Sequence, residues 1–86
     1  MFYTYVLQSK KDRHMYYGYT KNLTERFEQH SKGKVESTKY RRPLKLVYYE
    51  ACCSKHDALN REAYFKTYHG RQFLQKRLKS YFTDSL

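Results

Sequence analysis

Residues 2–19 have the sequence FYTYVLQSKKDRHMYYGY, and this stretch decides the fold of the N-terminal half. Residues 2–8 alternate in polarity and are rich in aromatic and β-branched types, which predicts a β-strand. Residues 15–19 have the same character and predict a second strand. The polar segment 9–14 between them is short, so the two strands are expected to form an antiparallel hairpin.

The register of this hairpin decides which side chains meet. If residues 10–12 form the turn, Tyr5 lies opposite Tyr16 or one residue away from it along the strand. Two tyrosines are therefore expected side by side on one face of the sheet.

A helix is predicted directly after the hairpin. Asn22 is a suitable N-cap with Glu25 three residues further on, and Gly33 lies just past the expected end, so the helix runs from about residue 23 to 32. Positions spaced i, i+3, i+4 and i+7 form its inner stripe, which consists of Leu23, Arg26, Phe27 and His30. An arginine and a histidine are thus expected to face the sheet.

The second half of the chain predicts a third strand and two further helices. A polar, basic loop over residues 33–43 precedes a strand over residues 44–51. Ser54 is expected to cap a second helix that ends before Gly70, and a last helix covers about residues 71–81.

The predicted fold is one α+β domain over residues 1–86, because a chain of 86 residues has room for a single core. It consists of a small three-stranded antiparallel sheet flanked by three helices, in the order β-β-α-β-α-α. The inner stripe of the second helix places one carboxylate, Glu62, among apolar neighbours, which are Ala58, Leu59, Ala63 and Phe65.

The charge of the chain points to a polyanionic partner. Lysine and arginine number 18 and aspartate and glutamate number 8, which gives a formal net charge of +10. Nucleic acid is the leading candidate, an acidic membrane surface is second, and a solvated surface without a ligand is the plain alternative. No apolar run approaches the ~20 residues of a membrane-spanning helix. The first residues lack the pattern of a secretory signal, so a cytoplasmic protein without a membrane partner is expected.

Five polar side chains are expected to converge on one face of the sheet: Tyr5, Tyr16, Arg26, His30 and Glu62. Each has a structural explanation when taken alone, because buried tyrosines and histidines are commonly packing residues and a surface glutamate commonly pairs with a lysine. Their combination in this order is more specific than any one of them.

The combination resembles the GIY-YIG nuclease superfamily. The first motif matches Tyr3-Thr4-Tyr5, and the second matches Tyr16-Tyr17-Gly18, with Gly18 as a structural turn glycine. Arg26 follows Tyr16 by ten residues, as the helix arginine of that superfamily does, with His30 one turn later and Glu62 in the second helix. The chain is most similar to the short stand-alone bacterial branch, through the segments MYYGYTKNLTERFEQHSKGK and YRRPLKLVYYE, and is also similar to the N-terminal nuclease domain of the bacterial excision-repair nuclease.

This resemblance implies a phosphodiesterase that uses one divalent metal, Mg²⁺ or Mn²⁺, held by Glu62. Arg26 would pair with the phosphate, since a planar charged fork suits its oxygens. Tyr16 is the candidate general base and His30 the alternative, because free tyrosine has a pKa of ~10 and free histidine ~6.5. Tyr5 would orient the water or Tyr16.

The expected partner is DNA, with RNA not excluded, and a protein partner or a homodimer is compatible with the sequence. No recognition helix or second domain accompanies the core, so low sequence specificity is expected, in repair or recombination. The basic loop would hold the nucleic-acid backbone through Lys32, Lys34, Lys39, Tyr40, Arg41 and Arg42.

Two alternatives stay open on the sequence alone. Tyr19 stands where repair nucleases of the superfamily often have lysine, and no asparagine follows Asn60 although many members have one in the last helix. These departures favour a nucleic-acid-binding module that has kept the fold and lost hydrolysis. A basic interaction protein without a nucleic-acid partner is the other alternative, and the dependence of binding on salt would distinguish it.

Overall fold

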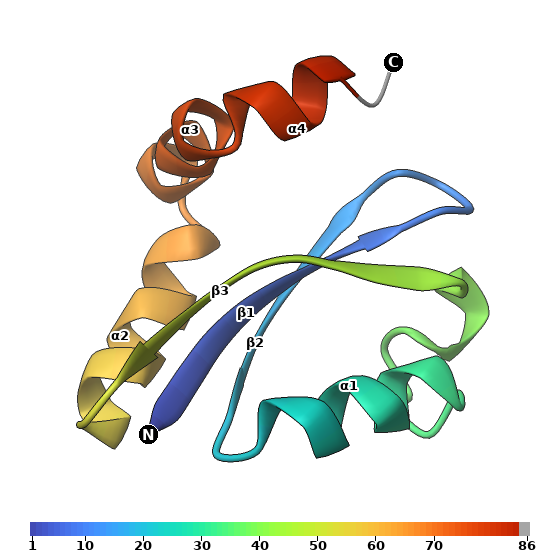
Figure 1. Cartoon of the computed structure of the whole chain (residues 1–86), viewed down its shortest axis with the longest axis horizontal. Coiled ribbons are helices and arrows are strands. Elements are labelled where there is room, and N and C mark those ends of the chain that lie inside the picture. The colour runs from blue at the N-terminus through green and yellow to red at the C-terminus, as the bar shows by residue number, and fades with distance from the viewer. Residues whose placement is uncertain (85–86) are drawn as a thin grey trace.

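The computed structural model describes residues 1–84 and has a three-stranded antiparallel sheet at its centre. The strands are β1 (Phe2–Ser9), β2 (Met15–Thr20) and β3 (Leu44–Cys52), in the spatial order β2-β1-β3. Both neighbouring pairs are antiparallel. In this order β1 is the central strand and β2 is an edge strand (Figure 1). The α+β class, the hairpin and the third strand predicted from the sequence are confirmed.

The hairpin register differs from the prediction by two residues. Tyr5 pairs with Gly18, and Tyr16 pairs with Leu7. The turn is longer than expected: the Ser9 amide donates to the His14 carbonyl at 3.0 Å, and Arg13 adopts a left-handed conformation with φ of 67°. A shift of two residues leaves every side chain on its original face, because the side-chain period of a strand is two.

Helices cover both faces of the sheet. We call the side that carries Tyr5 and Leu7 the Tyr5 face; it packs against Leu23 and Phe27 of α1 (Leu23–Ser31). On the opposite side, the Val6 face, Val6 packs against α2 (Lys55–Phe65) and α3 (Tyr68–Arg77), through side chains that include Phe65 and Leu74. Figure 1 shows α1 on one side of the sheet and α3 on the other. Because it lies between the two layers, β1 is buried from Thr4 to Ser9.

The predictions for α1 are confirmed. The Asn22 side chain accepts a hydrogen bond from the Glu25 amide at 3.1 Å, and Gly33 follows the helix with φ of 76°. A left-handed residue at this position favours glycine. His30 is completely buried, as the stripe of the helix predicts.

The C-terminal helices differ from the prediction at Gly70. The sequence predicts that the second helix ends before this glycine, but α2 already ends at Phe65, and Gly70 lies in the first turn of α3. Thr67 caps α3 by accepting from the Gly70 amide at 3.1 Å. A Cβ atom at position 70 would lie 1.8 Å from the Tyr64 carbonyl oxygen, so this glycine permits a close approach of two helices and does not terminate one.

The last predicted helix is divided in two. α3 ends with Leu78 as its C-cap, and α4 (Lys79–Asp84) follows immediately. No helix within residues 1–84 is long and apolar enough to cross a bilayer. Ser54 occupies the N-cap of α2 as predicted, although its side chain makes no capping hydrogen bond.

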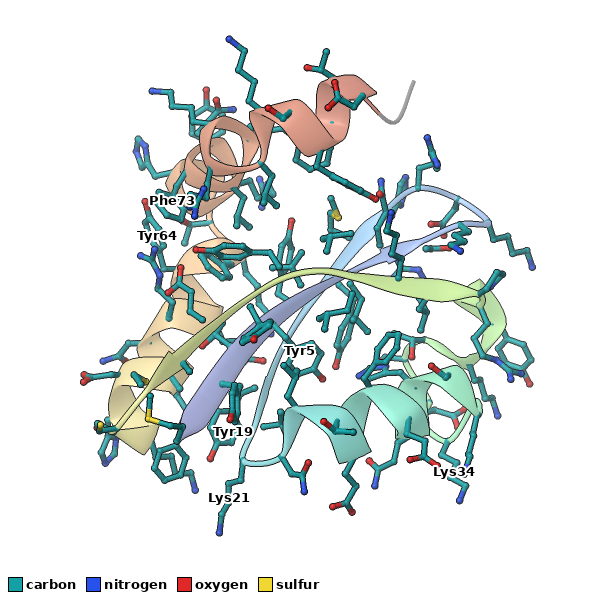
Figure 2. All side chains as sticks on the ribbon, viewed as in Figure 1. Tyr5, Tyr19, Lys21, Lys34, Tyr64 and Phe73 are labelled. Carbon is teal, nitrogen blue, oxygen red and sulfur yellow. The ribbon has the colours of Figure 1, made fainter. Side chains whose placement is uncertain are left out.

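A charged clamp fixes α2 against the sheet. Arg61 of α2 donates two hydrogen bonds to Glu50 of β3, at 2.8 and 3.0 Å. The same guanidinium lies over the ring of Phe73 of α3, 4.5 Å from its centroid, and over Tyr64 at 5.0 Å. Tyr64 and Phe73 lie together at the junction of α2 and α3 (Figure 2). The clamp therefore determines the position of the helix that carries Glu62.

Gly70→Ala is expected to destabilise the protein by at least about 2 kcal/mol, because the new methyl group would collide with backbone atoms that cannot rotate away. Chemical denaturation measures the loss. The control is Gln72→Ala, an exposed position on the same helix, which should change stability by less than about 0.5 kcal/mol. Equal stabilities of the two variants would contradict the close approach of α2 and α3.

Candidate active site

Tyr5 is the centre of the candidate site, and Gly18 makes room for it. A Cβ atom at position 18 would lie 2.3 Å from Cζ of Tyr5, so the tyrosine ring lies directly over the glycine. Gly18 is inside β2 and not in a turn, which corrects the role predicted for it from the sequence. In Figure 2, the Tyr5 side chain extends from β1 into the space between the sheet and α1.

Three rings of the predicted site meet above β1 and β2. The centroids of Tyr5 and Tyr16 are 6.3 Å apart, and those of Tyr16 and His30 are 5.1 Å apart, with His30 edge-on to both tyrosines. The structure thus brings Tyr5, Tyr16 and His30 together despite the shifted register, since both tyrosines remain on the Tyr5 face.

A buried hydrogen-bond chain connects this cluster to the loop after α1. The Tyr5 hydroxyl and Nε2 of His30 are 2.8 Å apart, and Nδ1 of His30 is 2.8 Å from Oγ1 of Thr38. All three side chains are at most 1% exposed, so neither histidine nitrogen is available to solvent. Thr38 is not predicted from the sequence, because a threonine in an irregular loop gives no periodic signal.

Burial keeps Tyr5 and His30 neutral. Desolvation raises the pKa of Tyr5 to about 12, against a smaller lowering effect from the Arg26 guanidinium. Desolvation, assisted by the charge of Arg26, lowers the pKa of His30 to about 4. At neutral pH the site therefore holds an un-ionised phenol hydrogen-bonded to an un-ionised imidazole.

Arg26 places a positive charge beside both tyrosine hydroxyls. Its pKa is raised mainly by hydrogen bonding to Tyr5, with a further contribution from Tyr16. The side chain is half-buried, and its Nη1 donates to Oε1 of Gln29 at 3.0 Å. This guanidinium is held in place yet still reaches solvent, as a phosphate-binding group must.

The prediction that Glu62 shares a sheet face with the tyrosines is wrong, because α2 packs on the Val6 face. The charge of Glu62 nevertheless contributes to the raised pKa of Tyr5. The carboxylate is half-buried and pairs with Lys66 at 3.4 Å. Within residues 1–84, no three His, Cys, Asp or Glu side chains gather as a metal-binding group. A single carboxylate fits a hard cation such as Mg²⁺, whose other positions are commonly filled by water and a substrate phosphate.

A cleft of about 460 Å³ opens beside Arg26. It lies where β2 leads into α1, and the first residue of α2, Lys55, contributes to its wall. Figure 2 shows Tyr19 and Lys21, two further lining residues, at this end of the strand. Neither Lys21 nor Lys55 is singled out by the sequence, because they lie 34 positions apart and only the folded chain brings them to one cleft.

The basic loop occupies a different surface. Figure 2 shows Lys21 and Lys34 at opposite ends of α1. Arg41 binds Asp12 at 3.3 Å, and Nε of Arg42 donates to the Lys39 carbonyl at 2.9 Å, so both arginines are engaged within the protein.

The remaining members of the loop set lie at or near the surface. Tyr40 is 76% exposed, with the Lys39 ammonium 4.9 Å from its ring centroid. Lys32 pairs with Glu28 and Lys39 with Glu36. This set is therefore separate from the cleft, and its role in binding nucleic acid stays a prediction.

The geometry agrees with a family match over most of the chain. Residues 1–75 match the model of the GIY-YIG catalytic domain. The chain belongs to the GIY-YIG family. This family is of nuclease type, and the resemblance drawn from the sequence is confirmed.

Relatives with similar sequences are designated UPF0213 proteins. A UPF0213 protein of Pediococcus pentosaceus is 47% identical over 66 residues, which cover 76% of this chain and 68% of the relative. One from Staphylococcus haemolyticus is 42% identical over 74 residues, covering 85% and 89%. The solution NMR structure of a UPF0213 protein from Bacillus halodurans matches with a TM-score of 0.55 and 32% identity, over 88% of this chain and 84% of that one.

The buried neutral His30 predicts a specific pH dependence of stability. Its pKa is about 4 in the folded protein and ~6.5 when unfolded, so the unfolded state binds the extra proton between these values. Stability should therefore fall as the pH decreases from about 6.5 to about 4, by up to about 3 kcal/mol from this residue. Urea denaturation of the wild type and of His30→Gln across this range isolates the effect, because the other histidines are present in both. A wild-type profile parallel to that of His30→Gln would contradict the prediction.

Proposed function

We propose that this protein is a metal-dependent endonuclease that hydrolyses DNA phosphodiester bonds with low sequence specificity, in repair or recombination. The observation that carries the proposal is the convergence of Tyr5, Tyr16 and Arg26 beside a cleft, with Glu62 in their electrostatic neighbourhood. Together these groups could supply a proton acceptor, a cation for the phosphate oxygens and a metal ligand, which are functions that phosphodiester hydrolysis uses.

Tyr16 is the residue that would accept the proton of the attacking water. Its side chain is half-buried, whereas Tyr5 and His30 are buried and bonded to one another. Tyr16 would act as a base in its phenolate form, which the positive charge of the neighbouring Arg26 guanidinium favours. On taking the proton of the attacking water, this phenolate would become the neutral phenol. Of the three candidate proton acceptors, Tyr16 alone combines access to solvent with a neighbouring cation.

Tyr5 acts as a positioning residue for this step. Its ring holds Tyr16 from one side, and its hydroxyl is fixed by His30. The assembly leaves the half-exposed Arg26 guanidinium to contact the non-bridging oxygens of the phosphate, where charge accumulates in the transition state.

Glu62 would hold Mg²⁺ or Mn²⁺, and the bound cation would supply Lewis-acid stabilisation of the leaving oxygen. Lys21 and Lys55 line the cleft and would contact the nucleic-acid backbone without reading its sequence. One such site cuts one strand, so cleavage of both strands would require a second copy of the chain, a protein partner or a second encounter.

Cleavage assays with point variants test the proposal. Supercoiled plasmid and labelled single-stranded DNA and RNA are incubated with Mg²⁺, with Mn²⁺ or with EDTA. We expect metal-dependent cutting that is abolished in Glu62→Gln and reduced about 10²-fold or more in Tyr16→Phe and in Arg26→Ala. RNA as the sole substrate would contradict the assignment to DNA.

The matched control is Glu36→Gln, which removes one carboxylate whose side chain is 87% exposed and lies on the loop after α1. It should cut like the wild type. Folded wild-type protein that binds DNA but does not cut would favour the alternative of a binding module, to which the absence of a late asparagine points.

Lys55→Gln is expected to weaken DNA binding and to reduce the slope of log K against log salt by about 1, because one phosphate contact is lost. Fluorescence anisotropy at several salt concentrations measures both quantities. Lys76→Gln removes the same charge from an exposed position of α3 and should leave the slope unchanged. Identical slopes for the two variants would exclude Lys55 from the interface.

A further inference from the structure

A second cavity, of about 410 Å³, lies on the Val6 face, away from Tyr5 and Arg26. Residues of the β1–β2 hairpin line one side of this cavity, and residues of α3 and α4 line the other. Tyr17 contributes to the lining, and its neighbour in the same strand, Tyr16, lies on the opposite face. The volume is in the range of small-ligand sites, and nothing in the nuclease mechanism uses it.

The walls of this cavity combine an apolar floor with a cationic rim. Val6, Leu74 and Leu78 supply aliphatic surface. The rim carries two cationic side chains, Arg13 and Arg71, together with the imidazole of His14, and none of the lining residues has a carboxylate.

Arg71 and Tyr17 lie close to one another inside the cavity. Burial raises the pKa of Tyr17, and the Arg71 guanidinium counteracts this effect. The guanidinium donates to the Lys66 carbonyl at 2.7 Å through Nη1, which fixes its position at the end of α2. A held arginine next to an aromatic ring suits a ligand with a flat apolar part and an anionic part.

We propose that this cavity binds one nucleotide of an unpaired nucleic-acid strand, with the base against the apolar floor and Tyr17 and the phosphate against the arginines of the rim. The choice of ligand follows from the walls: a hydrocarbon would leave the rim unused, and a free inorganic anion would leave the floor unused. Only an unpaired base can enter, because a paired base is enclosed in its duplex.

The position of the cavity connects it with the candidate active site. Tyr16 and Tyr17 are consecutive residues of the edge strand β2, so the two sites lie on either side of one strand. A flexible strand can pass over such an edge and contact both faces, whereas a duplex is stiff over this length. The assignment of the ligand to the same strand that is cut rests on the proposed function, while the cavity itself is tested without cleavage.

The test is a titration of the wild-type protein with thymidine 5′-monophosphate, without metal, followed by two-dimensional NMR of the backbone amides. We expect the largest shifts at Met15, Tyr17, Arg71 and Leu78. Thymidine without phosphate and inorganic phosphate alone should each bind about tenfold more weakly, because each lacks one half of the ligand.

Two variants confirm the location. Gln75→Tyr adds a ring at an exposed lining position, and it should block the mononucleotide and weaken single-stranded DNA about tenfold while leaving duplex affinity unchanged. Arg71→Gln should weaken the mononucleotide about tenfold, provided that its melting curve remains that of a folded protein. Lys76→Gln, next to the cavity but outside its lining, is the matched control and should bind like the wild type.

Shifts confined to the cleft of Lys21 and Lys55, or equal binding of phosphate and mononucleotide, would overturn the inference. So would Gln75→Tyr with undiminished binding of single-stranded DNA. Mononucleotide shifts at the cavity in a protein that never cuts DNA would refute the proposed nuclease and leave the nucleotide site standing. The two proposals can therefore fail separately.

Discussion

The site depends on the position of Tyr5, which two interactions fix: its ring lies against Gly18, and its hydroxyl is hydrogen-bonded to His30. The ring can lie flat over β2 only because position 18 has no side chain. Its hydroxyl then requires a buried partner, since an unsatisfied polar group costs about 1–3 kcal/mol. His30 supplies that partner and thereby fixes the rotation of α1 about its axis. Arg26, one turn earlier on the same stripe, is brought to the tyrosines by the same rotation, and Thr38 ties the following loop to the imidazole.

Burial gives the two tyrosines different chemistry although their side chains are identical. Tyr5 extends from the central strand, where desolvation raises its pKa to about 12 and lowers the pKa of its partner His30 to about 4, so this pair stays neutral. Tyr16 extends from the edge strand β2 and is half-buried. The positioning role proposed for Tyr5 and the base role proposed for Tyr16 follow from this difference in their distance from the edge of the sheet. The clamp of Arg61 on Glu50 contributes from the other face, because it fixes the helix that carries Glu62.

Local signals predicted the parts of the fold that depend on local chemistry. The helix from Asn22 to Gly33 was predictable because its cap, its stripe and its terminal glycine lie within a dozen residues. The hairpin register was not, because it depends on the left-handed conformation of Arg13 in a turn without a recognisable signature. Gly70 was misassigned because sequence alone does not distinguish a glycine that ends a helix from one that admits another backbone. Thr38 and Lys55 reach the site only when the chain folds, and no sequence pattern marks either of them. Arg26 and His30, in contrast, were predicted from the inner stripe of their helix.

The basic side chains behind the net charge of +10 are not equally available to a ligand. The basic loop supplied the first candidates for binding a polyanion, yet Arg41 and Arg42 donate to acceptors of the protein itself. Arg41 thereby connects the loop to the hairpin, and Arg42 connects it to the end of α1. Lys21 and Lys55, in contrast, border the cleft that contains Arg26. Under the proposed function, a polyanion is therefore expected along β2 and not on the loop, because Lys21 and Lys55 border the same cleft as Arg26.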